Sequence, residues 1–176
     1  MTRLNENTVL NVKNTSFTVT AYVTLPEEAA EGAIIAQGGR FGGWSLYFRS
    51  GVPVYAHNFV GMQTYTVAAD RAIGPGPQVL QLRFDYDGGG AGKGGDVRLI
   101  CDDEQIGHGR IERTVPALFS FDEGLDIGFD SLDPVVDEYA TPKGRFTGSI
   151  DRVEVDIAPE AYHDPDLALR ARYSRH

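Results

Sequence analysis

The sequence predicts an all-β fold, an antiparallel sandwich of two sheets. Apolar and polar residues alternate with a period of two along most of the chain, as they do in strands with one buried face. Turn-forming residues separate these segments at short, regular intervals. The chain also has 21 glycines among 176 residues, which suits a protein rich in tight turns and not a helical one.

The first half of the chain contains five expected strands. Residues 16–25, SFTVTAYVTL, alternate over their whole length, and Pro26-Glu27-Glu28 follows as a turn. Gly38-Gly39 and Ser50-Gly51 are the next turn signals. The strands expected around them cover residues 32–39, 43–51, 52–60 and 63–69.

The second half contains five more expected strands. Gly74-Pro75-Gly76-Pro77 separates the two halves, and Asp102-Asp103 forms a further turn. The strands expected here cover residues 78–86, 96–100, 104–115, 125–130 and 144–157. We find neither an internal repeat nor an interdomain linker, so the sandwich is expected to span residues 1–157 as one domain.

The glycine-rich stretch FDYDGGGAGKGG, residues 84–95, raises the question of a phosphate site. A phosphate loop needs a glycine five residues before Gly92-Lys93 and a Ser or Thr after the lysine, but Asp87 and Gly94 occupy those positions. A strand pattern follows in place of the helix that would face an anion. The stretch therefore predicts a hairpin connection.

Composition excludes several classes of function. The net charge of -9 disfavours a nucleic-acid partner, and no apolar run approaches the roughly 20 residues of a membrane span. The first residues lack the apolar core of a signal peptide, which leaves the localisation open. Cys101 is the only cysteine and ends an apolar strand, so we expect a buried structural thiol.

Several stretches in order carry a family resemblance. The segment GGWSLYFRSGVPVYAHN, residues 42–58, resembles the paired aromatic strands of concanavalin-A-like and laminin-G-like sandwiches. The chain from Met1 to about Ile157 is similar to the C-terminal domain of bacterial arylsulfatases. The stretches that carry this similarity are MTRL, VKNTSFTVTAYVTLP, EGAIIAQGGRFGGWSLYF, FDYDGGGAGKGG, GRIERTVPALFSFDEGLDIGFD and RFTGSIDRVEVDI.

The resemblance implies a jelly-roll sandwich of the concanavalin-A-like lectin/glucanase type. Sulfatases carry Cys/Ser-x-Pro-x-Arg in an α/β catalytic domain, whereas Cys101 here is followed by Asp-Asp-Glu-Gln. We therefore expect a non-catalytic accessory domain that packs on or steers a sulfatase-type catalytic partner. A stand-alone carbohydrate-binding, lectin-like module is the alternative.

A hydrolase is a more distant alternative. Some glycoside hydrolases on this fold place Glu-x-Asp-x-Glu carboxylates on one strand, and a period of two puts Glu154 and Asp156 on one face. Glu160 lies beyond the position that the third carboxylate of this motif would occupy, and Pro159 does not suit a central strand. The alternation of residues 152–157 also fits a strand with one face in solvent and the other packed on the core, so we nominate no catalytic residue.

Acidic residues are densest between residues 122 and 138. Sandwiches of this class often hold one structural calcium, and Asp130 and Asp133 are the first candidate ligands. The alternative is an acidic loop in which Asp130 accepts hydrogen bonds from the turn at Pro134. The four histidines show no pair with zinc-ligand spacing.

Aromatic side chains on neighbouring strands form a candidate sugar platform. Strict alternation places Trp44, Leu46 and Phe48 on one face and Tyr47 on the other. Aromatic residues also supply much of the core in a sandwich. If a set is exposed to bind a glycan, we expect Tyr47, Tyr55 and His57.

The tail, residues 158–176, lies outside the resemblance. It contains a short helical pattern from Asp166 with arginines near its end, and it equally suits a frayed terminus.

Overall fold

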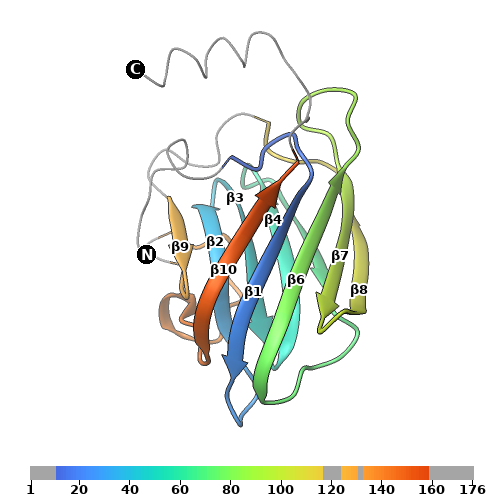
Figure 1. The fold of residues 1–176 in the computed structure, drawn as a ribbon. Coiled ribbons are helices and arrows are strands. Elements are labelled where there is room, and N and C mark those ends of the chain that lie inside the picture. Colours follow the sequence, from blue (N-terminus) through green and yellow to red (C-terminus); the bar gives the residue numbers. More distant parts are fainter. Residues whose placement is uncertain (1–10, 117–123, 131–132, 159–176) are drawn as a thin grey trace, which may run out of the picture.

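Two antiparallel sheets of five strands each form the molecule. The computed structural model describes residues 11–116, 124–130 and 133–158. The first sheet, here the β1 sheet, has the strand order β10-β1-β6-β7-β8, and the second, the β3 sheet, has the order β5-β4-β3-β2-β9. Figure 1 shows the β1 sheet in front of the β3 sheet. This arrangement confirms the predicted all-β, two-sheet antiparallel sandwich.

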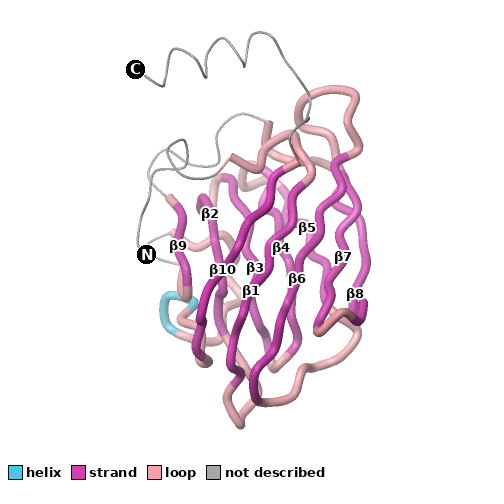
Figure 2. The backbone as a smooth tube through the Cα atoms, in the orientation of Figure 1, coloured by secondary structure: helices cyan, strands magenta, loops and turns pink. Residues whose placement is uncertain are grey.

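The strands follow the predicted segments closely. The ten strands are β1 (Phe17–Leu25), β2 (Gly32–Gly39), β3 (Gly42–Arg49), β4 (Val52–Phe59), β5 (Gln63–Ala68), β6 (Gly76–Tyr86), β7 (Gly95–Cys101), β8 (Glu104–Ile111), β9 (Leu125–Ile127) and β10 (Ser149–Ile157). The only helical element among the described residues is the single-turn 3₁₀ segment η1 (Pro142–Gly144), which Figure 2 shows in cyan. No helix in the described part of the chain is long and apolar enough to cross a membrane.

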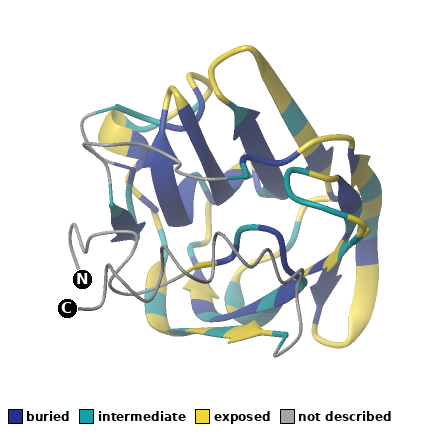
Figure 3. Cartoon of the chain, turned by 90° about the horizontal axis from the view of Figure 1, so that it is seen from above, coloured by how far each residue is buried: buried dark blue, intermediate teal, exposed yellow. Residues whose placement is uncertain are grey.

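The main core lies between the sheets and follows the period-two pattern. Alternate residues of β1, from Phe17 to Leu25, pack against Trp44, Leu46 and Phe48 of β3 in one cluster. Phe17 stacks on Phe84 with ring centroids 5.3 Å apart. Figure 3 shows the two layers from above, with the buried stretches concentrated in the strands. Cys101 is buried, as predicted, and burial raises the pKa of its thiol to about 11.

The β3 sheet is buried on its outer face as well. A second apolar cluster joins Tyr47, Ala33 and Val54 of this sheet to Val135 and Val136 of the segment that crosses it. Tyr139 packs edge-on against Tyr47, with ring centroids 5.3 Å apart. Almost every residue of strands β2 and β3 is therefore buried, whereas exposed and half-buried residues alternate along most of β10.

Tight turns join several neighbouring strands. The two-residue turns Ser50-Gly51 and Asp102-Asp103 have positive φ at both residues, as the tightest hairpin turns require. The pair Val60-Gly61, in the three-residue turn between β4 and β5, has positive φ at both residues as well. The predicted turns at Ser50-Gly51 and Asp102-Asp103 are confirmed. The stretch from residue 87 to residue 94 joins β6 to β7, which confirms the predicted hairpin. Gly92 N–H donates to Asn14 Oδ1 at 2.8 Å and holds this loop in place.

The two sides of the sandwich close differently. On one side, β5 contacts β8, and Gly107 and Gly109 let the strands approach closely. A Cβ atom at Gly109 would lie 2.7 Å from Val67 Cγ2, so no larger residue fits there without movement. On the other side, β9 and β10 are the edge strands and leave a cleft between them. The predicted tail is outside the described residues except for Ala158.

Gly32 provides a test of the close packing over the β3 sheet. Its φ is +95°, and a Cβ atom there would lie 2.1 Å from the carbonyl oxygen of Arg145. Gly76 has a similar φ of +101° with nothing within 4 Å of the same position. We expect Gly32→Ala to lower the free energy of unfolding by about 3 kcal/mol and Gly76→Ala by about 1 kcal/mol. Urea denaturation measures both, and equal losses would contradict the close approach.

Candidate functional site

A polar groove lies on the outer face of the β3 sheet, next to the segment that covers this face. It has a volume of about 490 Å³ and is open to solvent. One wall is formed by β4 and β5, and the opposite wall by residues 134–138. The lining residues are Arg40, Asn58, Gly61, Thr64, Thr66, Pro134, Val135, Val136, Asp137 and Glu138.

The lining of the groove offers both donors and acceptors. Thr64 and Thr66 lie opposite Asn58 and Ala56 in the β4–β5 ladder, and both threonines are exposed. Asp137 and Glu138 supply carboxylates from the other wall. Hydroxyl groups donate and accept, whereas carboxylates only accept, so the groove matches a ligand rich in hydroxyls.

Asn58 fixes the floor of the groove at one end. Its Nδ2 donates to the carbonyl oxygens of Arg40, at 2.8 Å, and Val135, at 3.0 Å. Its Oδ1 accepts from Gly61 N–H at 2.9 Å. This one buried amide ties together the β2–β3 turn, the β4–β5 turn and the covering segment. The shape of the groove is therefore built into the fold before any ligand binds.

Charged contacts fix the second wall. Arg40 pairs with Asp133 at 3.1 Å and with Asp137 at 3.6 Å. The Tyr47 hydroxyl donates to the Glu138 carboxylate, and Arg49 Nη1 donates to the Glu138 carbonyl oxygen at 2.7 Å. The wall carries more carboxylates than guanidinium groups, so the groove has an acidic character.

An exposed apolar rim adjoins the groove. Of the four large apolar residues that are exposed in the described chain, three are at this end: Phe41, Val60 and Met62, with 69%, 39% and 81% exposure. A Cβ atom at Gly61 would lie 3.4 Å from Phe41 Cδ1, so the ring packs beside the turn that lines the groove. An exposed aromatic ring beside hydroxyl and carboxylate groups is a suitable surface for a sugar ring.

The β4–β5 turn stores backbone strain. Val60 has a φ of +47°, in the left-handed region, and Met62 N–H donates to the Phe59 carbonyl oxygen at 2.9 Å. A β-branched residue is unusual there, because its Cβ is crowded by the backbone. Such strain is typical of sites where the side chain has a use beyond the fold.

The structure corrects the predicted sugar platform. Tyr47, Tyr55 and His57 are 0%, 1% and 3% exposed, so none of their rings offers a surface to a glycan. Tyr55 and His57 point into the main core, and Tyr47 lies under the covering segment. For Tyr47 the prediction was wrong because alternation does not tell whether a distant segment covers the second face of a sheet. For Tyr55 and His57 it was wrong because alternation within one strand does not give the register with the next, and these two residues lie opposite Leu46 and Trp44 on the core face.

His57 is a structural residue in the core. Its Nε2 accepts from Val115 N–H at 3.1 Å, and its Nδ1 lies 3.5 Å from the Tyr55 hydroxyl. Burial lowers the pKa of His57 to about 4, because the charged imidazolium would lose its hydration. The ring is therefore neutral at pH 7 and holds the chain after β8 against β4.

The predicted calcium ligands serve other roles. Asp130 is 2% exposed, and its Oδ2 accepts from Val135 N–H at 2.8 Å and from the Tyr139 hydroxyl at 2.6 Å. Asp133 is paired with Arg40. Among the described residues, no three His, Cys, Asp or Glu side chains gather as a metal site would require. These two residues do not fit a calcium site as they stand, and calcium binding stays a prediction.

Glu154 and Asp156 share the outer face of β10, as predicted. Both are exposed, and Glu154 pairs with Arg152 at 3.0 Å. Val153 and Val155 are half-buried and face the main core. The two carboxylates lie outside the lining of both the groove and the cleft. A glycosidase needs its carboxylates on either side of a bound sugar, and this exposed face provides no such enclosure.

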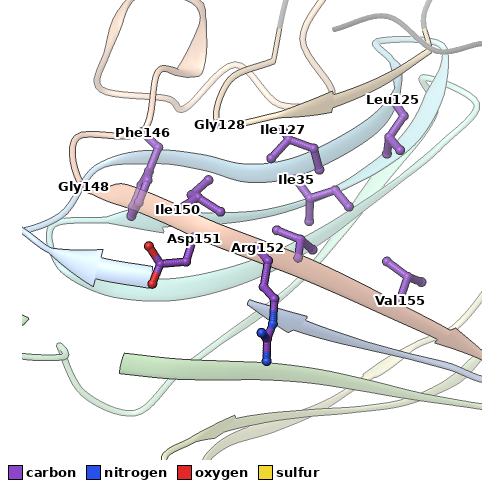
Figure 4. Close-up of a pocket in the computed structure, with 11 residues that line it drawn as sticks. Ile35, Leu125, Ile127, Gly128, Phe146, Gly148, Ile150, Asp151, Arg152 and Val155 are labelled. Atoms are coloured by element: carbon purple, nitrogen blue, oxygen red, sulfur yellow. The ribbon is translucent and has the colours of Figure 1, made fainter. Parts of the chain in front are cut away.

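A cleft with a volume of about 700 Å³ lies at the open side of the sandwich. Its lining is mostly apolar and comes from β2, β9, β10 and the approach to β10. Figure 4 shows Ile35, Ile127 and Ile150 gathered between β9 and β10, with Phe146 at one end. Arg152 extends from β10 away from this group, and its guanidinium lies 4.0 Å from the centre of the Tyr22 ring.

Comparisons with solved structures support the architecture. The carbohydrate-binding module CBM40 of the Ruminococcus gnavus IT-sialidase, bound to alpha2,3 sialyllactose, has a TM-score of 0.55 and 16% identity, over 91% of this chain and 83% of that chain. The laminin alpha2 LG1-3 region has a TM-score of 0.55 and 13% identity, over 88% of this chain and 28% of that chain. No protein-family model and no curated protein matches the sequence.

These likenesses show the fold, which is a concanavalin-A-like and laminin-G-like jelly roll. The first of these solved structures is named as a carbohydrate-binding module, and the second as a region of a laminin chain. At these identities the comparisons do not show an arylsulfatase origin, which still rests on the sequence resemblance. The groove and its apolar rim were missed in the sequence, because Phe41, Val60 and Met62 lie in turns where single apolar residues carry no periodic signal.

The pKa of His57 predicts a loss of stability in mild acid. The unfolded chain binds a proton at about pH 6.5, whereas the folded chain binds it only near pH 4. The stabilising contribution of the neutral His57 ring is therefore fully present above pH 6.5, and it is lost as the pH decreases from 6.5 toward 4. Between pH 7 and pH 5 we expect a loss of about 2 kcal/mol from this group. Urea denaturation at pH 7 and pH 5 measures the free energy of unfolding. Glutamine does not titrate, so the loss between the two pH values should be smaller by about 2 kcal/mol in His57→Gln than in the wild-type protein. Equal losses for the two proteins would contradict the role of His57.

Proposed function

We propose that this domain is a glycan-binding module without catalytic activity and that the polar groove is its binding site. The observation that carries the proposal is the groove itself, where Thr64, Thr66, Asp137 and Glu138 adjoin the exposed Phe41 ring. The likeness to CBM40 supports it, because that module is bound to sialyllactose on a sandwich of the same kind.

The chemistry of the groove suits a sugar. The hydroxyls of a pyranose ring donate to the carboxylates of Asp137 and Glu138, and they accept from the Thr64 and Thr66 hydroxyls. The face of the ring stacks on Phe41. Asn58 and Val135 already hold the walls in position, so little ordering cost is added on binding.

The charge of the groove selects the class of glycan. Arg40 is already paired with Asp133 and Asp137, so its positive charge is largely neutralised. The chain as a whole carries a net charge of -9. A sialylated or sulfated glycan would be repelled, and we expect a neutral glycan to be preferred.

The accessory role beside a sulfatase-type catalytic domain is the second candidate. The sequence resemblance supports it, and the apolar cleft between β9 and β10 is a surface that a packed partner domain would cover. It is compatible with glycan binding at the groove, because the groove and the cleft have no lining residue in common. No observation favours a hydrolase that uses Glu154 and Asp156.

Removing a single hydroxyl tests the groove. We expect Thr66→Val to weaken binding of a neutral oligosaccharide about fivefold, because one hydrogen bond is lost at nearly constant shape. Thr18→Val on β1 is the matched control, since Thr18 lies on the outer face of the other sheet and should leave affinity unchanged. A glycan array that includes lactose and sialyllactose, followed by calorimetry, makes the measurement.

Two outcomes would contradict the proposal. The first is binding to no glycan on the array. The second is equal affinity for the Thr66→Val and Thr18→Val variants, which would place the binding site elsewhere. A preference for sialyllactose over lactose would overturn the expected selectivity for neutral sugars.

The strained turn provides an independent test. Asparagine adopts a positive φ more readily than valine, so Val60→Asn should raise the melting temperature by about 3 °C. It should also weaken glycan binding, since it removes an apolar group beside Phe41. Ser50→Asn, at the matching position of the β3–β4 turn with a φ of +50°, is the control and should leave binding unchanged. A stabilised Val60→Asn protein with full affinity would show that the valine has no role in binding.

A further inference from the structure

We propose that the C-terminal segment of this chain returns along β10 and that its residues 169–173 pair there as an additional antiparallel edge strand, which fills the apolar cleft. The proposal goes beyond the glycan-binding function and does not depend on it. It follows from the edge of β10, from the cleft beside that edge and from the order of apolar and charged residues in the segment.

The edge of β10 has backbone groups directed toward the open side of the sandwich. Within the described residues, β10 pairs only with β1. Ala158 N–H donates to the Ser16 carbonyl oxygen at 3.0 Å, so the groups of this residue are directed toward β1. Because the direction alternates along an antiparallel strand, the groups of Val153, Val155 and Ile157 are directed away from β1. A further strand can pair with them.

The regular part of this edge ends at Val153. In the β1–β10 ladder Asp151 is an extra residue between Ile150 and Arg152, without a partner of its own on β1. Such a bulge interrupts the regular alternation of backbone groups. A partner strand can therefore pair regularly with residues 153–157 and not beyond them, which sets the length of the proposed strand.

The cleft beside this edge provides a place for apolar side chains. Val153 and Val155 belong to its mostly apolar lining, and Figure 4 shows Ile150 and Val155 on the strand that borders it. Ile157, at the end of β10, is 39% exposed. A strand paired with residues 153–157 would direct every second side chain into the cleft and remove apolar surface from water.

The C-terminal segment can reach this edge. Ala158 follows β10 directly, and residues 159–176 continue from it. Residues 158–168 are long enough for the chain to turn back, and a loop of this length costs little more than a shorter one. Pro159 and Pro165 fall in this loop, where the absence of their N–H groups breaks no strand pairing.

The residues after this loop have the pattern of a strand with one buried face. Leu169, Ala171 and Tyr173 alternate with Arg170 and Arg172. The same residues suit a short helix when they are considered alone, but helix propensity is a weak preference that tertiary contacts override. Beside an apolar cleft and a strand edge, the alternation directs the apolar side chains inward and the arginines into solvent.

The charges on the outer face of β10 select the register. In one register Arg170 lies opposite Asp156. Arg172 then lies opposite Glu154, which gives two attractive cross-strand pairs. A shift of two residues in one direction places Arg172 opposite Arg152, where like charges repel. A shift in the other direction leaves only one attractive pair.

This assignment changes what the cleft offers to a partner domain. The segment and a partner domain cannot fill the cleft at the same time, so they compete for it. A partner would gain only the difference between its own contacts and those of the segment that it displaces. The segment thus protects the apolar cleft in the isolated chain.

A disulfide across the proposed register tests the pairing in the full chain. Glu154 and Arg172 would form a pair without backbone hydrogen bonds, with Cα atoms about 4.5 Å apart, which suits a disulfide. Arg170 would lie diagonally to Glu154, beyond disulfide reach. Mild oxidation should therefore close the intramolecular bond at least about tenfold faster in E154C/R172C than in the matched control E154C/R170C. Cys101 is buried and common to both variants. Non-reducing gel electrophoresis at low protein concentration makes the measurement.

Hydrogen exchange provides a second measurement without new thiols. The Val155 amide is directed away from β1, so it should be protected in the wild-type chain only if a further strand covers it. Arg172→Glu places like charges opposite each other and should speed its exchange about fivefold. Arg175→Glu, the same change of charge outside the paired residues, should leave the rate unchanged. The double variant R172E/E154R restores opposite charges and should restore protection.

The results separate the occupants of the cleft. Faster closure in E154C/R172C together with a protected Val155 amide would establish the strand and its register. Equal rates for the two cysteine pairs, or a faster rate in E154C/R170C, would overturn the proposal. An unprotected Val155 amide in the wild-type chain would overturn it too and would leave the cleft to a partner domain. Disulfide-linked dimers as the main product would instead assign the edge to a second copy of the chain.

Discussion

The buried carboxylate of Asp130 organises the face of the sandwich that we consider functional. It accepts from Val135 N–H and from the Tyr139 hydroxyl, which in turn lies 2.7 Å from Ser45 Oγ of β3. These contacts hold a long connection against the outer face of the β3 sheet. Burial, followed by the negative charge of Asp130, raises the pKa of Tyr139, so the phenol remains a neutral donor to that carboxylate. The groove exists because this connection supplies its second wall.

Most of the fold could be predicted because strands and tight turns are local properties of the chain. Each expected strand is present, and the alternation of Trp44, Leu46 and Phe48 against Tyr47 is confirmed by their separation into two clusters. The glycine-rich connection between β6 and β7 was also assigned correctly, because the strand pattern on both sides of it is strong. These features depend on residues that are close together in the sequence, so the two-residue period of apolar and polar side chains is enough to predict them.

The candidate site could not be predicted in the same way, because it joins residues far apart in the chain. Thr64 and Thr66 meet residues 134–138, and only the folded structure brings them together. One signal was present: strands β2 and β3 are almost continuously apolar or small, which is typical of strands buried on both faces. That reading would have placed Tyr47 in a core and directed attention to the turns, where Phe41 is exposed.

The groove and the apolar cleft lie on different parts of the sandwich, which has a consequence for binding. The groove borders β5, one edge of the β3 sheet, whereas the cleft lies beside β9 at the opposite edge. A partner domain packed over the cleft would therefore leave the groove open to a glycan. A small polar groove with one exposed ring is suited to weak binding of a single sugar. A second domain at the cleft would then add its own contacts to the same glycan surface, and the combined binding would be stronger than that of the groove alone.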